Sequence, residues 1–144
     1  MSFDMNKSLG FILNRTALAS KNAFNQKIKD YEISPEQWSV IYRVVEAPGI
    51  SQKVVSDSTY KDQGNLTRMI DKLVKNGFLT KKQNSKNRRE IQLFPTNKSI
   101  DLSKTVAKHS TEHNNNMLNN FSKEEKEQLF SLLNKVYDNL NKKD

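Results

Sequence analysis

Cysteine is absent from the 144 residues, and glycine and proline occur only four and three times. Without a thiol the chain has no disulfide, no thiol catalysis or redox sensing and no cysteine zinc site. No apolar run approaches the roughly 20 residues of a membrane-spanning helix. Asn14 and Arg15 interrupt the apolar run near the N-terminus, which predicts that it is not a signal peptide. We therefore expect a cytoplasmic protein without a membrane partner.

Groupings of residues that carry enzyme chemistry are also missing. The sequence has no Gly-rich phosphate loop, no Ser/His/Asp set that resembles a catalytic triad and no metal-ligand cluster. We expect no enzymatic activity, no cofactor and no metal. His109 and His113 have the i,i+4 spacing that can present two nitrogens to one ion, with Glu112 between them, but carboxylates would have to complete the site. Solvated histidines in a polar helix are the favoured interpretation.

Positive charge is in excess and unevenly distributed. The net charge is +8, and nine Lys/Arg stand against two Asp between positions 61 and 89. Such an excess favours a polyanion, either nucleic acid or an anionic membrane surface. Apolar residues make up 35% of the chain, which is lean for a self-sufficient core. Burial of further surface against a second copy would help.

Local signals give this charged region a shape. Residues 62–76 have the apolar period of a helix that ends at Gly77, and residues 78–82 and 89–94 read as strands around a polar tip at 83–88. A helix followed directly by a basic hairpin is the layout of a winged helix-turn-helix. A merely solvated charged surface is the alternative, but it does not explain why the charge coincides with this layout.

The remaining chain is predicted to be helical. One helix covers 6–30. Ser34, Pro35 and Gln37 start a second helix, Ser51 caps a short third one, residues 97–120 form a helix with a polar centre, and a capping box at Ser122 opens the last helix. The expected fold is mainly α with a small β-hairpin wing, a winged helix-turn-helix with N- and C-terminal dimerisation helices. We place the dimerisation regions at 1–33 and 98–144 and the DNA-binding domain at 34–97.

The helix at 62–76 is expected to read double-stranded DNA with its N-terminal turns, because Leu66, Ile70, Leu73 and Val74 fall on the opposite, inward side. Amide side chains pair with adenine and Arg pairs with guanine. The expected base-reading residues are Gln63, Asn65, Thr67 and Arg68. The expected backbone and wing contacts are Ser51, Gln52, Lys61, Lys72, Lys75, Lys86, Arg88 and Arg89.

Three stretches resemble the MarR family of winged-helix transcriptional regulators: ISPEQWSVIYRV (33–44), NLTRMIDKLVKNGFLTKKQNSKNRREIQLFPT (65–96) and FSKEEKEQLFSLLNKV (121–136). The resemblance implies an obligate homodimer that binds a palindromic operator, usually as a repressor, and that a small anionic, aromatic or lipid-like ligand often releases. The four base-reading residues match positions of the family's reading helix, and Arg89 matches its wing arginine.

The chain departs from the family pattern at two places. Asn87 stands where an acid commonly precedes the wing arginine, and a neutral Asn cannot form the ion pair that steadies the wing, so we expect a more mobile tip. The usual Leu-Thr-x-x-Gly after the wing is Phe94-Pro95-Thr96-Asn97-Lys98, without glycine. We expect the junction with the next helix to differ there.

The resemblance also implies a ligand cleft between the first helix and the start of the winged block. Its candidate residues are Phe11, Arg15, Trp38 and Tyr42. Arg15 would pair with a ligand carboxylate and the aromatic rings would stack on the ligand body. In the alternative, which is favoured, Trp38 and Tyr42 are core residues and Arg15 forms an ion pair between subunits.

The function expected from the sequence is a dimeric, sequence-specific DNA-binding regulator, a repressor of the winged-helix type. One alternative is an architectural protein that coats DNA with little base preference. A second alternative is a helical protein-interaction adaptor that does not use its winged fold.

Overall fold

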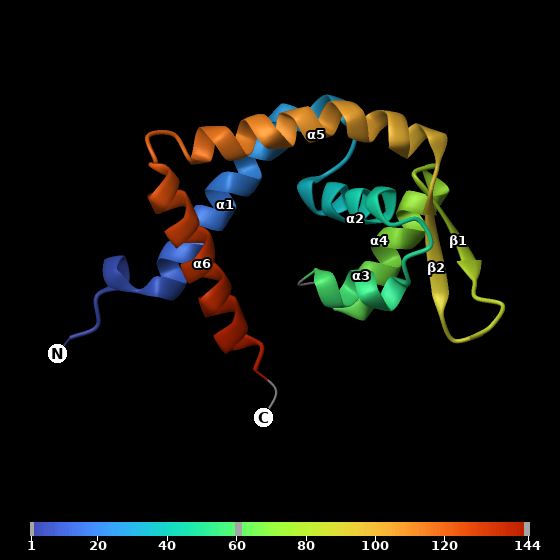
Figure 1. Cartoon of the computed structure of the whole chain (residues 1–144), viewed down its shortest axis with the longest axis horizontal. Helices are drawn as coiled ribbons and strands as arrows, with labels where there is room; N and C mark the ends of the chain where they lie inside the picture. Colours follow the sequence, from blue (N-terminus) through green and yellow to red (C-terminus); the bar gives the residue numbers. More distant parts are fainter. Residues whose placement is uncertain (1, 60–61, 143–144) are drawn as a thin grey trace. The chain divides into compact units, whose positions relative to one another are not determined.

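The computed structural model describes residues 2–59 and 62–142. In chain order the elements are the 3₁₀ helix η1 (Met5–Lys7), α1 (Leu9–Ile28), the 3₁₀ helix η2 (Lys29–Tyr31), α2 (Pro35–Glu46), α3 (Gln52–Ser58), α4 (Gln63–Lys75), β1 (Leu79–Gln83), β2 (Ile91–Pro95), α5 (Asn97–Met117) and α6 (Lys123–Leu140) (Figure 1). The predicted fold class, mainly α with one small hairpin, is confirmed.

The chain forms two compact units, Met1–Ser110 and Thr111–Asp144, with the division inside α5. The first unit holds the elements from η1 to β2 together with most of α5. The second unit holds the end of α5 and α6. The boundaries 1–33, 34–97 and 98–144 that the sequence suggests for dimerisation and DNA binding stay a prediction.

Helix starts follow the capping signals in the sequence. The Ser34 hydroxyl accepts from the Gln37 backbone N–H at 3.1 Å, and the Gln37 side chain accepts from the Ser34 N–H at 2.9 Å. Ser122 and Glu125 repeat this reciprocal arrangement at the start of α6. Each box satisfies two backbone groups that a helix end leaves without partners, which is why α2 and α6 begin where the sequence predicts.

The end of α4 and the start of the wing are joined by a tight turn at Gly77. Its φ of 81° lies in the left-handed region that favours glycine. The N–H of Phe78 donates to the Leu73 carbonyl at 2.9 Å and that of Gly77 donates to the Val74 carbonyl at 3.1 Å. This pair of bonds is a Schellman cap. It sends the chain from the reading helix directly into β1.

The wing is an antiparallel pair in which Leu79 faces Pro95, Lys81 faces Leu93 and Gln83 faces Ile91. The observed strands start one or two residues later than the predicted 78–82 and 89–94. Phe78 belongs to the helix cap, and hydrogen bonds from the Asn84 N–H to the Glu90 carbonyl and from the Glu90 N–H to the Asn87 carbonyl place residues up to Glu90 in the connecting loop. The predicted helix over 6–30 is likewise shorter, because Ser8 caps α1 and a separate 3₁₀ turn follows Ile28.

One apolar core lies within the first unit. It joins residues of α1, α2, α3, α4, α5 and the wing, and its most deeply buried side chains are Ile28, Val40, Ile41, Val44, Val55, Leu66, Ile70, Leu73, Leu79, Leu93 and Val106. Leu66, Ile70 and Leu73 are fully buried and Val74 is half-buried, so the predicted inward side of α4 is confirmed. Burial of that side leaves the polar side of α4 facing solvent.

The connection between α2 and α3 is tied to the wing. Gly49, at a φ of 89°, donates its N–H to the Leu93 carbonyl at 2.8 Å, and Leu93 donates back to the Ile50 carbonyl at 2.9 Å. A bridge between Ser51 and Gln92 continues this pairing. These bonds hold the start of α3 against β2.

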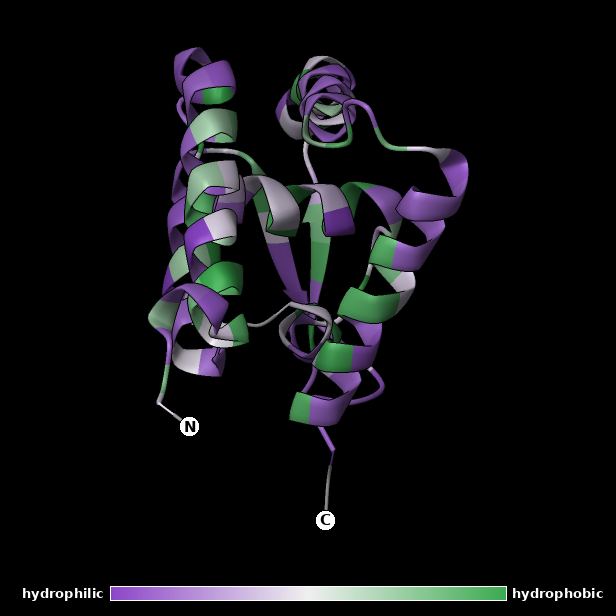
Figure 2. Cartoon of the chain, turned by 90° about the vertical axis from the view of Figure 1, so that its left-hand side faces the viewer, coloured by the Kyte–Doolittle hydropathy of each residue, from purple (hydrophilic) through white to green (hydrophobic). Residues whose placement is uncertain are grey.

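Apolar side chains of the second unit are largely exposed. No residue of α6 is buried, and Leu132 and Leu140 are 60% and 77% exposed. Hydrophobic residues recur along one side of this helix, which leads to the C label in Figure 2. In the first unit, Leu9 and Leu18 on α1 are also more than half exposed, whereas Phe24 and Ile28 near its end are buried.

Candidate nucleic-acid interface

The outward side of α4 carries the four predicted base-reading residues. Gln63, Asn65, Thr67 and Arg68 are all exposed on the first two turns of the helix. The buried side chains between them attach the helix to the core, so these polar groups are held on a rigid element. Lys72 and Lys75 are exposed in its last turn. Lys61, the remaining predicted contact of this region, lies outside the described residues.

The N-terminal turn of α4 contains a chain of polar contacts. Asp62 caps the helix by accepting from the Asn65 backbone N–H at 2.8 Å, and its other carboxylate oxygen accepts from Asn65 Nδ2 at 2.7 Å. Asn65 Oδ1 in turn accepts from the Arg68 guanidinium. Asp62 is a residue that the sequence analysis missed as part of this surface, although its place directly before the helix was a capping signal.

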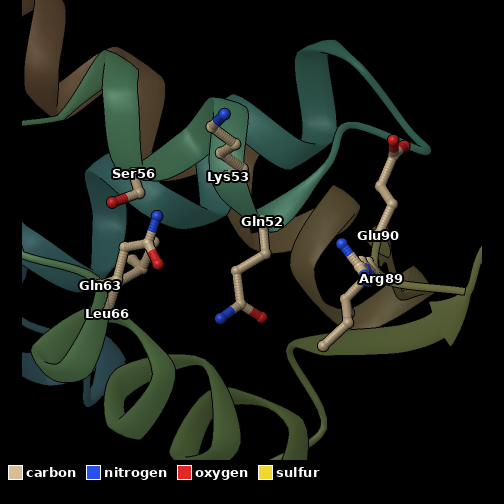
Figure 3. A pocket seen from close by; sticks show the side chains of 8 residues that line it. Gln52, Lys53, Ser56, Gln63, Leu66, Arg89 and Glu90 are labelled. Carbon is tan, nitrogen blue, oxygen red and sulfur yellow. The ribbon is translucent and has the colours of Figure 1, made fainter. Parts of the chain in front are cut away.

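Thr67 and Gln52 hold α3 and α4 together. Gln52 Nε2 donates to Thr67 Oγ1 at 2.9 Å, and Thr67 Oγ1 donates to the Gln63 carbonyl at 2.8 Å. The Gln52 amide reaches from α3 toward α4 in Figure 3. The single proton of the Thr67 hydroxyl is therefore already used within the helix. These two side chains link the two helices of the helix-turn-helix by a hydrogen bond.

The wing presents its cations at the tip. Lys86, Arg88 and Arg89 are all exposed. Asn84 Oδ1 accepts from the Lys86 N–H at 2.9 Å, and Asn87 Oδ1 accepts from the Arg89 N–H at 3.2 Å. Asn side chains commonly build turns by bonding their own backbone two residues on. Asn87 thus restrains the backbone of Arg89 by a hydrogen bond.

An ion pair joins the reading helix to the wing. Lys81 Nζ on β1 lies 2.7 Å from Asp71 Oδ1 on α4, with both side chains about half exposed. At that exposure the pair contributes little to stability, roughly 0–1 kcal/mol. It links β1 to the polar side of α4.

A hollow of about 140 Å³ lies between α3, the start of α4 and the return strand of the wing. Its lining residues are Gln52, Lys53, Ser56, Gln63, Leu66, Arg89, Glu90 and Ile91 (Figure 3). Three of the predicted DNA contacts, Gln52, Gln63 and Arg89, therefore come together around one depression. Sequence reasoning missed Lys53, for which the only signal was a cation two residues after the Ser51 cap.

The junction after the wing ties α5 to the end of α4. Thr96 Oγ1 donates to the Gly77 carbonyl at 2.7 Å, and Lys98 Nζ donates to the Asn76 carbonyl at 2.9 Å. The Lys98 ammonium also lies 4.3 Å from the centre of the Phe78 ring. The sequence departs from the family pattern at this junction, and these contacts show how the chain closes it without a glycine.

The candidate ligand-cleft residues form two separate pairs. The Arg15 guanidinium lies 5.3 Å from the centre of the Phe11 ring on α1, and the rings of Trp38 and Tyr42 on α2 are 5.0 Å apart. Trp38 is buried in the core, as the packing alternative expects, whereas Tyr42 is 37% exposed. A role in ligand binding stays a prediction for all four residues.

The expectation that the two histidines of α5 are solvated is wrong for His113 and holds only in part for His109. His109 is half-buried because Tyr31 covers it, with the Tyr31 hydroxyl 3.1 Å from His109 Nε2 and the rings 5.6 Å apart. His113 is only 7% exposed. Within the described ranges, no three His, Cys, Asp or Glu side chains are grouped as a metal site would require.

The sequence and the fold are similar to those of known proteins. The model of the MarR family matches residues 33–91. The transcriptional regulator YybA of Bacillus subtilis is 31% identical over 140 residues, which cover 95% of this chain and 89% of YybA. The chain belongs to the MarR family of transcriptional regulators.

Solved structures of MarR-family proteins share the fold. A MarR-family regulator from Listeria monocytogenes, complexed with 26mer DNA, has a TM-score of 0.87 and 29% identity, covering 93% of this chain and 89% of that one. BpsR of Bordetella bronchiseptica, whose DNA binding is described as regulated by 6-hydroxynicotinic acid, has a TM-score of 0.89, with 96% and 99% coverage. At 19% identity, BpsR supports the fold alone.

The family match covers the helix-turn-helix together with the first strand and the tip of the wing. Residues 33–91 run from the start of α2 to the first residue of β2 and include Gln52, Asn65, Arg68 and Arg89. MarR-family proteins are regulators of transcription and not enzymes. Across residues 2–59 and 62–142, none of the helices has both the length and the apolar character that a bilayer crossing requires.

Proposed function

We propose that this protein is a homodimeric, sequence-specific repressor that binds a palindromic operator. The observation that carries the proposal is the exposed polar side of α4, anchored by a fully buried opposite side and flanked by a cationic wing tip. Groove-reading helices present the residues of their first turns to base edges while neighbouring cations contact phosphates. The Listeria relative in complex with 26mer DNA supports the same use of the fold here.

In this proposal Gln63, Asn65, Thr67 and Arg68 face the bases. Thr67 acts through its methyl group, because its hydroxyl proton is already donated to the Gln63 carbonyl. The backbone contacts come from the start of α3, the last turn of α4 and the wing tip: Ser51, Gln52, Lys72, Lys75, Lys86, Arg88 and Arg89. Lys53 joins this set because it lines the same hollow as Gln52 and Arg89.

The proposed dimer is supported by apolar side chains that a single copy leaves exposed to water. On α6 these are Phe130, Leu132, Leu133, Tyr137 and Leu140, and on α1 they are Leu9 and Leu18. Burial of apolar surface is worth about 25 cal/mol per Å², so helices of this kind associate. A twofold-symmetric dimer presents two reading helices to two half-sites about one DNA turn apart, roughly 34–36 Å.

Release from DNA is proposed to follow binding of a small anionic or aromatic ligand near Phe11, Arg15, Trp38 and Tyr42. The Arg15 guanidinium and the exposed Tyr42 ring offer one charged and one aromatic group for such a ligand. The ligand switches the protein only if it binds the DNA-free arrangement more tightly. A transcriptional regulator has to act where the chromosome is, so we place the protein in the cytoplasm.

Selection of bound sequences from a random duplex pool tests the proposal. We expect an inverted repeat, and at physiological salt we expect affinity for that repeat to exceed affinity for random duplex by at least about 10³-fold. Mass measurement by light scattering should give two copies free and two copies per operator. A pool without a consensus would contradict the proposal and favour the architectural alternative, and no binding even at low salt would favour the adaptor alternative.

A further inference from the structure

We propose that Asp62 is a specificity-determining positioning residue, which presets the Asn65 side chain to read adenine. The proposal rests on the proposed function, because it needs α4 to face base edges. Asp62 itself would not touch DNA. It would act through the orientation of the Asn65 amide.

Asp62 uses both carboxylate oxygens on one residue. Oδ1 caps the helix through the Asn65 backbone N–H at 2.8 Å, and Oδ2 accepts from the Asn65 side-chain nitrogen at 2.7 Å. A cap needs only the first of these bonds, and Ser or Asn at this position supplies it nearly as well. The second bond is an additional contact, specific to a carboxylate, that fixes a side chain on the exposed side of α4.

The other end of the Asn65 amide is held as well. Its Oδ1 accepts from the Arg68 guanidinium. A flipped amide would direct its NH₂ group at a cation and its oxygen at a carboxylate, replacing two favourable contacts by two unfavourable ones. Asp62 and Arg68 together therefore select one of the two amide orientations before any DNA is present.

The selected orientation leaves part of the hydrogen-bonding capacity of the Asn65 amide unused. An Asn amide has two N–H donors and two oxygen lone pairs, and Asp62 and Arg68 use one of each. The exposed side chain keeps one donor and one acceptor. Adenine presents an acceptor at N7 and a donor at N6 in the major groove, which is the complementary pair. An amide that is already oriented loses less freedom on binding, so its discrimination is greater.

The negative charge of Asp62 distinguishes the proposed positioning role from a role as a helix cap alone. An exposed carboxylate on the DNA-facing side repels phosphates, so Asp62 opposes sequence-independent binding. Its loss should lower discrimination at one base pair and at the same time leave unchanged or strengthen binding to random duplex. A lost helix cap would instead weaken all binding together with stability.

The test uses the full-length dimer with the substitutions Asp62→Asn and Asp62→Ser, which both keep an N-cap acceptor. Asp57→Asn is the matched control, because it removes the charge of another exposed acid of the helix-turn-helix. Affinities are measured by fluorescence anisotropy for the selected operator, for operators with each A·T pair changed in turn to G·C in both half-sites, and for random duplex. Thermal unfolding is recorded for every variant.

We expect both Asp62 variants to lose about fivefold in discrimination at a single A·T pair, and to bind random duplex as tightly as the wild type or more tightly. Asn65→Ala should lose preference at that same pair, and adding Asp62→Asn should cause no further loss. Asp57→Asn should leave the affinity for random duplex unchanged or raise it, and it should not change any base preference.

Unchanged discrimination in the Asp62 variants, alongside normal wild-type preference, would overturn this inference and leave the proposed function standing. A uniform loss for all duplexes with a lower melting temperature would also overturn it, because it would reduce Asp62 to a cap. A wild-type protein that prefers no sequence would overturn the proposed function itself, and the inference with it.

Discussion

Helices α4 and α6 are both amphipathic and both begin with a side-chain cap, yet their apolar sides have different surroundings. In α4, Leu66, Ile70 and Leu73 are fully buried, whereas in α6 the residues Leu132 and Leu140 are more than half exposed. The fold of one copy therefore completes the burial of α4, and its polar side remains available for a ligand. The apolar side of α6 stays exposed to water, and in the proposed dimer it is the surface for association.

The largest effect in this comparison is expected when a side chain on the buried side of α4 is truncated. Ile70→Ala should lower the free energy of unfolding by about 2–5 kcal/mol, because it removes a fully buried side chain and leaves a cavity. Urea unfolding measures the change. Leu132→Ala on α6, at a position 60% exposed, is the matched control and should cost much less in dilute monomer. Equal losses for the two variants would contradict the contrast.

A charge on the apolar side of α6 should disrupt association. Leu132→Glu is expected to weaken the dimer by about 2–4 kcal/mol, because the carboxylate would lose water in an apolar interface. Sedimentation equilibrium measures the mass as a function of concentration. Ser131→Glu adds the same charge on the polar side of the helix, about 180° around it from Leu140, and should leave the mass unchanged. A variant Leu132→Glu that stays fully dimeric would show that α6 is not the association surface.

Changes on the polar side of α4 should affect DNA binding and not folding. Arg68→Ala should weaken binding to the selected operator by about 1–3 kcal/mol and relax the base preference of the protein. The free energy of unfolding should change little. Arg89→Ala on the wing should weaken binding to all sequences alike and reduce the salt slope by about 0.9. Anisotropy titrations over a range of salt separate the two effects. Operator affinity that survives both substitutions would remove these residues from the interface.

The smallest effects are expected at the two capping boxes. Ser34→Ala and Ser122→Ala should each cost about 1 kcal/mol, because each leaves a backbone N–H without its partner. Ser34→Ala should lower the free energy of unfolding by the same amount at every protein concentration. Ser122→Ala should lower it and should also weaken the dimer. The conservative variants Ser34→Asp and Ser122→Asp retain a cap and should restore stability. If the stability of the two Ala variants depended on protein concentration to the same extent, the contrast between α2 and α6 would be contradicted.

Features with a local cause could be read from the sequence. Ser34 with Gln37, Ser122 with Glu125 and the glycine at 77 mark helix ends by contacts over a few residues. The inward side of α4 also follows from spacing alone, because a helix brings residues three and four apart to one side. These signals placed the predicted reading helix and wing within one or two residues of their observed bounds.

Features with a non-local cause could not be read in this way. The bond between Gln52 and Thr67 links two helices, and the contact between Tyr31 and His109 joins residues 78 positions apart. Nothing in the neighbourhood of His109 or His113 in the sequence indicates burial, so solvated rings were the natural expectation. The links from Asp62 through Asn65 to Arg68 are local in sequence, but which amide orientation they select depends on side-chain geometry.

The sequence alone was enough to predict the helices, the basic hairpin and the polar side of α4, because periodicity, caps and charge act over short distances. Only the folded molecule decided which apolar residues find cover, how α3 is held on α4, and which donors and acceptors of the reading helix remain available. Those outcomes depend on contacts between residues that are far apart in the chain, because such contacts determine which groups are buried and which are hydrogen-bonded.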